Sequence, residues 1–243
     1  MNPLIEFLEQ TNGTVFINED GVRSEFRLLP PLSAPELEAL SEKIPCSLPQ
    51  EIREVLSFAR GFDGTWLGEI EFGNLTGLFG LENIFPHAIE LANDGAGNCW
   101  IVDLTTESTS WMPIFYACHD APVIVYQTDS LLHFAEEVVR GGNKPWKSEA
   151  NDVWGHLSDL IWTENPGMLS HAHCRQSTDQ DIKTFAESLD ESWQFIDLRS
   201  PVLGDGFSWG RYGPQTVIKR FGEKRLFAYQ RKSARRRIVD AFR

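Results

Sequence analysis

The chain has 243 residues, 42% of them hydrophobic and 12% aromatic, which is the composition of a folded globular protein with one large domain or two small ones. Its net charge of −13 conceals an asymmetry, because residues 1–150 hold 23 acids against 8 bases whereas residues 211–243 hold 11 bases against 2 acids. No apolar run approaches the roughly 18–20 residues that cross a bilayer, and the N-terminal MNPLIEFLEQTNG lacks the basic start of a secretory signal. We therefore expect a cytoplasmic protein with no membrane partner.

The first 61 residues are predicted to form helices and one hairpin. Residues 1–29 combine a short helical pattern with TVFIN and EFRLL, two strand-like runs that flank the turn signal EDGV. Ser33 is placed to cap a helix that has Pro35 in its first turn. A second helix covers QEIREVLSFARG, where apolar residues recur at i, i+3, i+4 and i+7, and Gly61 is expected to end it.

Residues 68–125 change to short β-type runs that glycine, proline or asparagine separate. The runs are EIEFG, LTGLFGL, HAIELA, NCWIVDL, PIFYACH and APVIVYQ. A helix follows over SLLHFAEEVVRGG, with Ser130 as its N-cap and Gly141 at its end. Strands clustered between two helical regions predict an α+β fold in which helices cover a mostly antiparallel sheet.

The polar segment NKPWKSEAND is typical of a linker, so we predict an acidic domain over residues 1–145 and a smaller α+β extension over residues 146–243. Within the extension, VWGHLSDLIW and TDQDIKTFAESL have helical patterns, the latter with a threonine N-cap, and WQFIDLR has a strand pattern. TVIKRF and RLFAYQ then form a hairpin around GEK, before the basic RKSARRRIVDAFR. The acidic region and the basic C-terminal region therefore either have different functions or attract each other.

The loop NDGAGN at residues 93–98 admits three interpretations. A calcium loop of the EF-hand type needs a glutamate at its twelfth position, and the chain here turns apolar instead. A phosphate loop needs its glycines before a helix, whereas these glycines precede the strand pattern CWIVDL and Asp94 would repel phosphate. The third interpretation is a tight turn between two strands, where asparagine and glycine accept a positive φ.

Several motifs between residues 30 and 140 follow one another in a set order. They are Leu48-Pro49 before an acidic helix, Gly61 after it, Asp94-Gly95 and Gly97-Asn98 before the strand with Trp100 and Asp103, then His119-Asp120, and Ser130-Leu131 with Phe134. In this order and spacing the chain resembles the SUKH superfamily, which includes yeast cell-wall-synthesis regulators and bacterial toxin-immunity proteins. The resemblance implies an α+β fold and an immunity-type function. The segment RGFDG departs from the Asn-Gly form commoner in that family, and residues 151–243 lie outside the resemblance.

The remaining motifs do not favour catalysis or metal binding. His171, His173 and Cys174 would form at most a weak surface metal site in an extended segment, because no second pair of ligands accompanies them. His119 and Asp120 would point to opposite faces of a strand, which disfavours a general base with an orienting acid. The sequence has no nucleophile elbow, zinc-protease or phosphate-loop motif. We therefore expect no enzyme activity, metal or cofactor, and four reduced cysteines.

The favoured hypothesis is an immunity-type protein that neutralises a cognate bacterial toxin by direct, non-catalytic binding. A balance of −15 over residues 1–150 attracts basic proteins and speeds their encounter. Carboxylates set into the cationic cleft of a nuclease or deaminase toxin would take the place of phosphates, and an exposed tryptophan would anchor the contact. The predicted partner-binding residues lie on the glycine-turn rim of the acidic domain and are Asp63, Trp66, Glu69, Glu71, Asp94 and Asp120.

The alternative hypothesis is a nucleic-acid or signalling adaptor that acts through the basic C-terminal hairpin. Cationic and aromatic residues alternate there, a mixture that contacts phosphates and stacks on bases. The residues concerned are Lys219, Arg220, Lys224, Arg225, Arg231 and Lys232. A further interpretation is that this hairpin packs against the acidic domain and balances its charge, since no nucleic-acid fold motif accompanies the basic residues.

Overall fold

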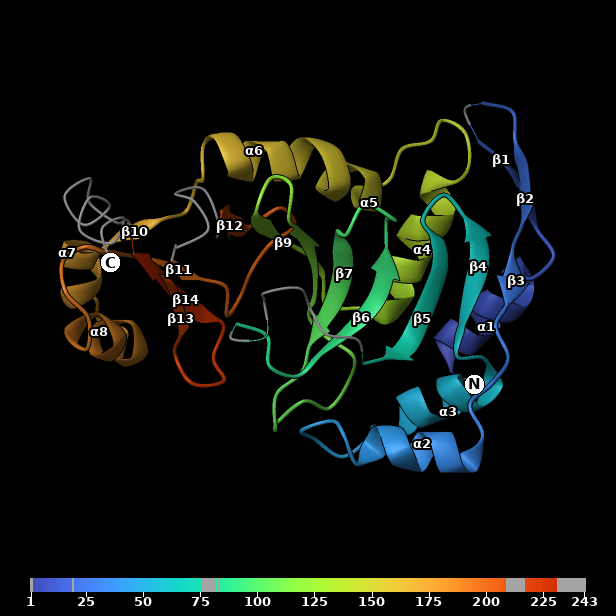
Figure 1. Ribbon diagram of the computed structural model, residues 1–243, viewed down its shortest axis with the longest axis horizontal. Helices are drawn as coiled ribbons and strands as arrows, with labels where there is room; N and C mark the ends of the chain where they lie inside the picture. The colour runs from blue at the N-terminus through green and yellow to red at the C-terminus, as the bar shows by residue number, and fades with distance from the viewer. Residues whose placement is uncertain (1, 19, 76–81, 83, 209–216, 231–243) are drawn as a thin grey trace, which may run out of the picture.

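The computed structural model describes residues 2–18, 20–75, 82, 84–208 and 217–230, and within them the chain has the predicted α+β fold (Figure 1). The described strands form an eight-stranded sheet in the order β12-β9-β8-β7-β6-β5-β4-β3, a four-stranded sheet in the order β10-β11-β14-β13, and the hairpin β1-β2. The pairings between these described strands are antiparallel, as expected.

The strands of the large sheet are short. They are β3 (Arg27–Leu28), β4 (Gly61–Thr65), β5 (Gly68–Asn74), β6 (Ala88–Asn93), β7 (Cys99–Asp103), β8 (Ile114–Cys118), β9 (Val123–Thr128) and β12 (Gly206–Ser208). The smaller sheet and the hairpin contain β10 (Leu169–Ser170), β11 (Trp193–Asp197), β13 (Val217–Arg220), β14 (Leu226–Gln230), β1 (Val15–Ile17) and β2 (Arg23–Glu25). The run LTGLFGL lies largely outside the described residues, as does the basic RKSARRRIVDAFR.

The helices are α1 (Pro3–Thr11), α2 (Ala34–Ser41), α3 (Gln50–Phe58), α4 (Leu131–Gly141), α5 (Glu149–Asp152), the π-helical turn η1 (Val153–Leu157), α6 (Ser158–Thr163), α7 (His171–Arg175) and α8 (Gln180–Glu187). None of these helices in the described part of the chain is long and apolar enough to cross a membrane.

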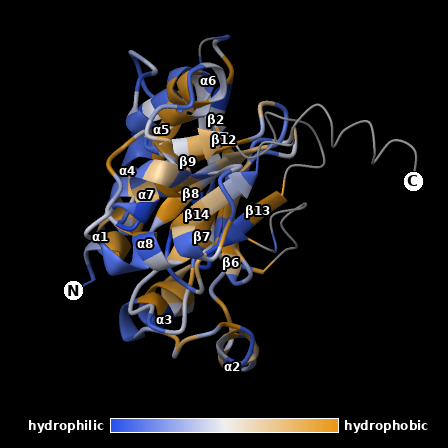
Figure 2. Cartoon of the chain, turned by 90° about the vertical axis from the view of Figure 1, so that its left-hand side faces the viewer, coloured by the Kyte–Doolittle hydropathy of each residue, from blue (hydrophilic) through white to orange (hydrophobic). Residues whose placement is uncertain are grey.

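Alternating side chains give the large sheet two apolar faces. In β7, Trp100 and Val102 point into a core that helices α1, α3, α4 and α6 share, while Cys99 and Ile101 point into a second core on the opposite face. Phe227 of β14 packs in that second core, so the smaller sheet covers the face that the helices leave open. Figure 2 shows apolar strands at the centre of the molecule and hydrophilic residues on the outer helices.

The smaller sheet has a third core on its other side. Phe195 and Ala228 of β11 and β14 pack there against Ile182 and Phe185 of α8. The chain therefore stacks as helices, large sheet, small sheet and helices α7 and α8. The predicted hairpin of β13 and β14 forms one side of the small sheet, with β13 at the edge and Ile218 opposite Tyr229.

The predicted division after residue 145 does not coincide with a break in the packing. Ala150, Val153 and Ile161 follow the division, yet all three are buried in the first core beside residues of the acidic region. Strand β12 also pairs with β9, with Phe207 opposite Ile124, and so completes the large sheet. Described residues on both sides of the predicted division therefore contribute to the same core and the same sheet.

Local signals explain where the helices begin. Ser33 and Glu36 form a capping box at α2, where Ser33 was predicted as the cap. At the start of α4 the predicted cap Ser130 accepts, at its Oγ, a hydrogen bond of 3.1 Å from the backbone N–H of His133. Asp179, one residue beyond the predicted threonine, caps α8. Gly61 does not end α3, which stops at Phe58, because it belongs to β4, where a Cβ atom would lie 1.8 Å from the carbonyl oxygen of Ile70.

Candidate partner-binding site

Three hairpin connections of the large sheet lie at the same end. Strands β4 to β9 run antiparallel in sequence order, so the turns β4–β5, β6–β7 and β8–β9 emerge on one side, next to α5 and α6 (Figure 1). These turns carry Trp66, Asp94 and Asp120, three of the residues predicted to bind a partner. The topology thus brings to one end of the sheet three residues that span 54 positions of the sequence, from Trp66 to Asp120.

A groove of about 540 Å³ opens beside these turns. Its walls come from the β1–β2 hairpin, the β4–β5 and β6–β7 turns, the loop after α4, and η1. We call it the tryptophan groove, and its defining residues are Phe16, Val22, Trp66, Asp94, Trp146 and Trp154. Val22 is 61% exposed and Trp154 is 48% exposed, so the groove presents apolar surface to solvent at its rim.

Each indole of the groove is held by a hydrogen bond. Trp66 Nε1 donates to the carbonyl oxygen of Val138 at 3.0 Å, Trp146 Nε1 donates to the carbonyl oxygen of Ile17 at 3.1 Å, and Trp154 Nε1 donates to Asp94 Oδ2 at 3.3 Å. The rings of Trp66 and Trp154 also meet edge to face with centroids 6.2 Å apart. The polar atom of each indole is therefore satisfied inside the protein, and the rings line the groove in fixed positions.

A glycine makes room for the central tryptophan. A Cβ atom on Gly141 would lie 2.6 Å from Trp66 Nε1 and 2.5 Å from Asn151 Oδ1. Gly141 is the last residue of α4, so the position predicted to stop the helix also lets the β4–β5 turn and α5 approach it. Trp66 is half-buried in consequence, with only part of its ring available to a partner.

The loop at residues 93–98 is a tight connection between β6 and β7, as the third interpretation predicts. Gly95 and Gly97 have φ values of 77° and 93°. Asp94 Oδ1 accepts hydrogen bonds from the backbone N–H groups of Ala96 and Asn98, at 2.9 and 3.1 Å, and Oδ2 accepts one from Asn98 Nδ2 at 2.7 Å. The carboxylate is thus occupied by donors of its own loop and by Trp154, an arrangement that organises a turn.

Asp94 remains a negative charge in the wall of the groove. Partial burial alone would raise the pKa of its carboxyl group, but the hydrogen bonds from Asn98, Ala96 and Trp154 outweigh burial and lower the pKa below its ordinary value. The groove therefore combines aromatic faces with a fixed anion.

The other predicted acids lie outside the groove. Asp63 and Glu69 are exposed on β4 and β5, and Glu71 forms an ion pair with Arg60 at 2.9 Å. Asp120 is exposed beside His119, at 3.2 Å from its Nε2. Of the six predicted residues, the tryptophan groove contains Trp66 and Asp94.

Sequence reasoning missed Trp146 and Trp154 because they lie in the predicted linker and in a predicted helix. Trp146 had a usable signal, because it stands among the polar residues of NKPWKSEAND, whereas Trp154 stands between Val153 and Gly155 and had none. Nothing in the sequence places the two rings beside Trp66, since only the tertiary fold does so.

Much of the basic hairpin is paired within the chain. Arg220 and Arg225 both bind Asp103, whose side chain is fully buried, with Nη1 of Arg220 at 2.8 Å and Nε of Arg225 at 2.7 Å from its carboxylate oxygens. Lys224 forms an ion pair with Asp181, and Lys219 lies over the ring of Trp193 at 5.1 Å. Arg231 and Lys232 lie outside the described residues. Arg220 and Arg225 therefore agree with the interpretation in which the hairpin packs against the acidic region and balances its charge.

The histidine–cysteine segment is helical and not extended. His171, His173 and Cys174 fall in α7, which Ser170 caps, and Cys174 is fully buried. His171 Nε2 lies 2.9 Å from the carbonyl oxygen of Ala186, so the ring joins α7 to α8. In the described ranges no three histidine, cysteine or acidic side chains cluster as metal ligands would. The four cysteines are buried free thiols.

Comparison of the chain with protein families, with curated proteins and with solved structures finds no match.

Proposed function

We propose that this chain is a non-catalytic binding protein whose tryptophan groove receives a basic segment of a protein partner. The observation that carries the proposal is the convergence of Trp66, Trp146 and Trp154 on one open groove with an ionised carboxylate, Asp94, in its wall. In the favoured version, which the resemblance to immunity proteins implies, the partner is a cationic toxin domain that binding silences.

The chemistry of the groove suits a lysine or arginine side chain. Cations are attracted to the faces of indole rings, and tryptophan is the best aromatic partner for them. Asp94 adds a negative charge next to these rings, and its lowered pKa keeps it ionised at neutral pH. The aliphatic stem of the same side chain would contact Phe16 and Val22, which line the groove.

The charge of the surrounding region supports the same choice of partner. The balance of −15 over residues 1–150 draws a basic protein toward this part of the chain and raises the rate of encounter. Because the indole hydrogen bonds fix the rings beforehand, little side-chain entropy is lost on binding, which favours affinity.

The test uses the tagged full chain as bait in cells of its source organism, with mass spectrometry to identify what is retained. A partner identified in this way is then titrated against wild type, Trp154→Ala and the control Val202→Ser, which changes an exposed apolar residue far from the groove in sequence and absent from its lining. Loss of a central tryptophan contact costs about 2 kcal/mol or more, so we expect Trp154→Ala to weaken binding about 30-fold and Val202→Ser to leave it unchanged.

Two results would end the proposal. Equal affinity of wild type and Trp154→Ala for every partner would place recognition elsewhere on the chain. Retention of DNA or RNA that nuclease treatment abolishes, with affinity that falls steeply as salt rises, would favour the adaptor hypothesis instead.

A further inference from the structure

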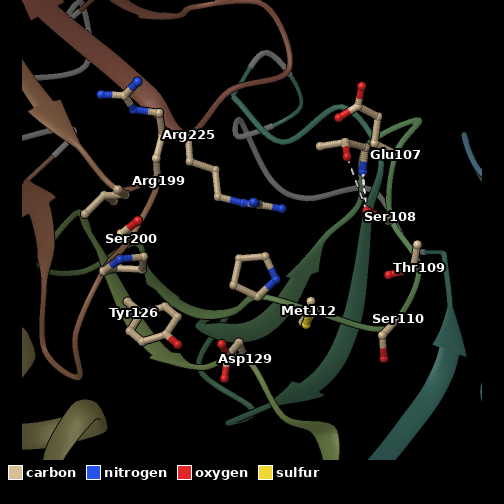
Figure 3. A pocket seen from close by; sticks show the side chains of 14 residues that line it. Glu107, Ser108, Thr109, Ser110, Met112, Tyr126, Asp129, Arg199, Ser200 and Arg225 are labelled. Atoms are coloured by element: carbon tan, nitrogen blue, oxygen red, sulfur yellow. Dashed lines mark hydrogen bonds between the residues drawn. The ribbon is translucent and has the colours of Figure 1, made fainter. Parts of the chain in front are cut away.

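A second cavity lies at the opposite end of the large sheet from the tryptophan groove. It has a volume of about 560 Å³ and lies between the β7–β8 loop, the end of β9, the segment after β11 and the start of β14 (Figure 3). Its walls therefore come from both sheets. Thr109, Tyr126, Asp129, Ser200 and Arg225 supply polar groups to it, and Met112 supplies an apolar one.

Arg225 brings a positive charge to this cavity. It shares one buried carboxylate with Arg220, which itself makes hydrogen bonds of 2.8 and 2.9 Å to the two oxygens of Asp103. Two guanidinium groups thus face one anion. Arg220 also donates to the backbone carbonyl oxygens of Ile84, Glu223 and Lys224, whereas the hydrogen bonds of Arg225 within the described residues go to Asp103 alone.

The exposed end of Arg225 is free to bind. Its Nε and Nη2 donate to Asp103, and Nη1 has no partner among the residues that the structure describes. Burial lowers the pKa of Arg225, which means that its charged form lacks full solvation and would gain from a second anion. The side chain retains 21% exposure, and Figure 3 shows it facing the cavity.

Tyr126 lies within the electrostatic influence of both Asp129 and Arg225. Burial and the carboxylate of Asp129 raise its pKa to about 12, and the guanidinium of Arg225 acts in the opposite direction. Both charged groups are therefore close enough to act on one hydroxyl, which stays protonated and able to donate. Figure 3 shows Tyr126 and Asp129 next to each other, across the cavity from Arg225.

The neighbouring charges of the cavity are already paired or exposed. Arg199 contacts Asp179, Asp181 and Asp197, so it offers no free cation. Glu107 stands exposed at the mouth. The acids at the mouth disfavour a dianion such as phosphate, whereas a single carboxylate beside Arg225 with a cationic group beside Asp129 matches the charges on both sides.

We infer that this cavity binds a small zwitterion of the α-amino acid class. Its carboxylate accepts a hydrogen bond from Arg225 Nη1, its ammonium group lies against Asp129 beside the Tyr126 hydroxyl, and its side chain contacts the apolar surface of Met112. This site is separate from the tryptophan groove, and its occupation would tie together the two sheets that form its walls.

The experiment titrates the full chain with each standard L-amino acid and follows the amide resonances of the cavity residues by NMR. Ligands of this size bind proteins with Kd on the order of 1 mM, so the titration extends to about 10 mM. We expect at least one amino acid to bind. We expect Asp129→Asn, an exposed change that leaves the core intact, to weaken it about tenfold.

Asp159→Asn is the matched control, because Asp159 is also exposed but lies on α6 outside the cavity lining. The affinity of this variant for the amino acid should equal that of wild type. The N-acetylated form of the same amino acid lacks the ammonium group and should bind wild type as weakly as the free amino acid binds Asp129→Asn. Absence of binding by every amino acid would overturn the inference. So would equal affinity for Asp129→Asn, or equal affinity for the acetylated form.

Discussion

Replacement of Asp103 by asparagine tests whether the basic hairpin is held by one buried anion. Asp103 is fully buried, and its carboxylate oxygens accept three guanidinium hydrogen bonds of 2.7 to 2.9 Å from Arg220 and Arg225. Asparagine keeps the size of the side chain but removes the charge, so two nearly buried cations lose their counter-ion. Removal of one partner of a buried ion pair costs about 3–5 kcal/mol, and because the amide oxygen still accepts a hydrogen bond, we expect a loss of about 3 kcal/mol.

Urea unfolding, followed by tryptophan fluorescence and far-UV circular dichroism, measures this loss as a fall in the free energy of unfolding. The double variant Asp103→Asn/Arg220→Gln completes a cycle, and its effect should be smaller than the sum of the single effects by about 1–3 kcal/mol because the two side chains share one interaction. Lys224→Gln is the control, since its partner Asp181 and Lys224 itself are both accessible and an exposed pair contributes at most about 1 kcal/mol.

A loss below about 1 kcal/mol for Asp103→Asn would refute this reasoning. It would mean that water reaches the carboxylate in solution, or that the hairpin does not stay docked on the large sheet. In either case Arg220 and Arg225 would become available to an external ligand, and the nucleic-acid hypothesis would regain support.

Three further predictions concern the packing and the pKa shifts. Gly61→Ala should lower the free energy of unfolding by more than about 3 kcal/mol, since its Cβ would lie 1.8 Å from the carbonyl oxygen of Ile70. Gly155→Ala should raise the free energy of unfolding by up to about 1 kcal/mol, because its Cβ meets no described atom within 4 Å, and thermal unfolding of both variants measures the two effects. The folded-state pKa of Asp94 lies below its ordinary 3.8, so its contribution to stability is complete above that pH and is lost as the pH falls through the lower, folded-state value. The difference in free energy of unfolding between wild type and Asp94→Asn, measured with urea, should therefore shrink only in acid. A constant difference down to complete protonation would contradict the assignment. Burial raises the pKa of Cys99 to about 12, so iodoacetamide at mildly alkaline pH should leave this thiol unmodified until urea is added, as mass spectrometry can show; rapid alkylation of the folded protein would be the contrary result.

The sequence predicted best what neighbouring residues decide. The caps at Ser33 and Ser130 and the strands between residues 88 and 128 depend on local hydrogen bonds and on alternation, and both are visible over a few positions. The segment SHAHC was wrongly predicted as extended because α7 has five residues, too few for a helical period to be seen.

The candidate site depends on contacts between distant parts of the chain, and these have no local signature. Trp66 and Trp154 are 88 positions apart, and Asp103 and Arg220 are 117 positions apart. The position of Asp94 in a turn was predictable from its glycines, but its contact with Trp154 was not, because that contact requires η1 to cross the end of the sheet. Charge counting alone also suggested that the basic hairpin was available to ligands, although its arginines face a buried carboxylate.

The late position of β12 in the chain has a consequence for synthesis. While the ribosome is still translating residues before 206, β9 lacks its neighbour and leaves its backbone amides and carbonyls open on one side. The nascent protein therefore keeps an unpaired strand edge from the completion of β9 at Thr128 until β12 is made at Gly206–Ser208, and a copy that stops between these points would retain it. Truncation before Gly206 therefore leaves β9 able to pair with an extended segment of another chain.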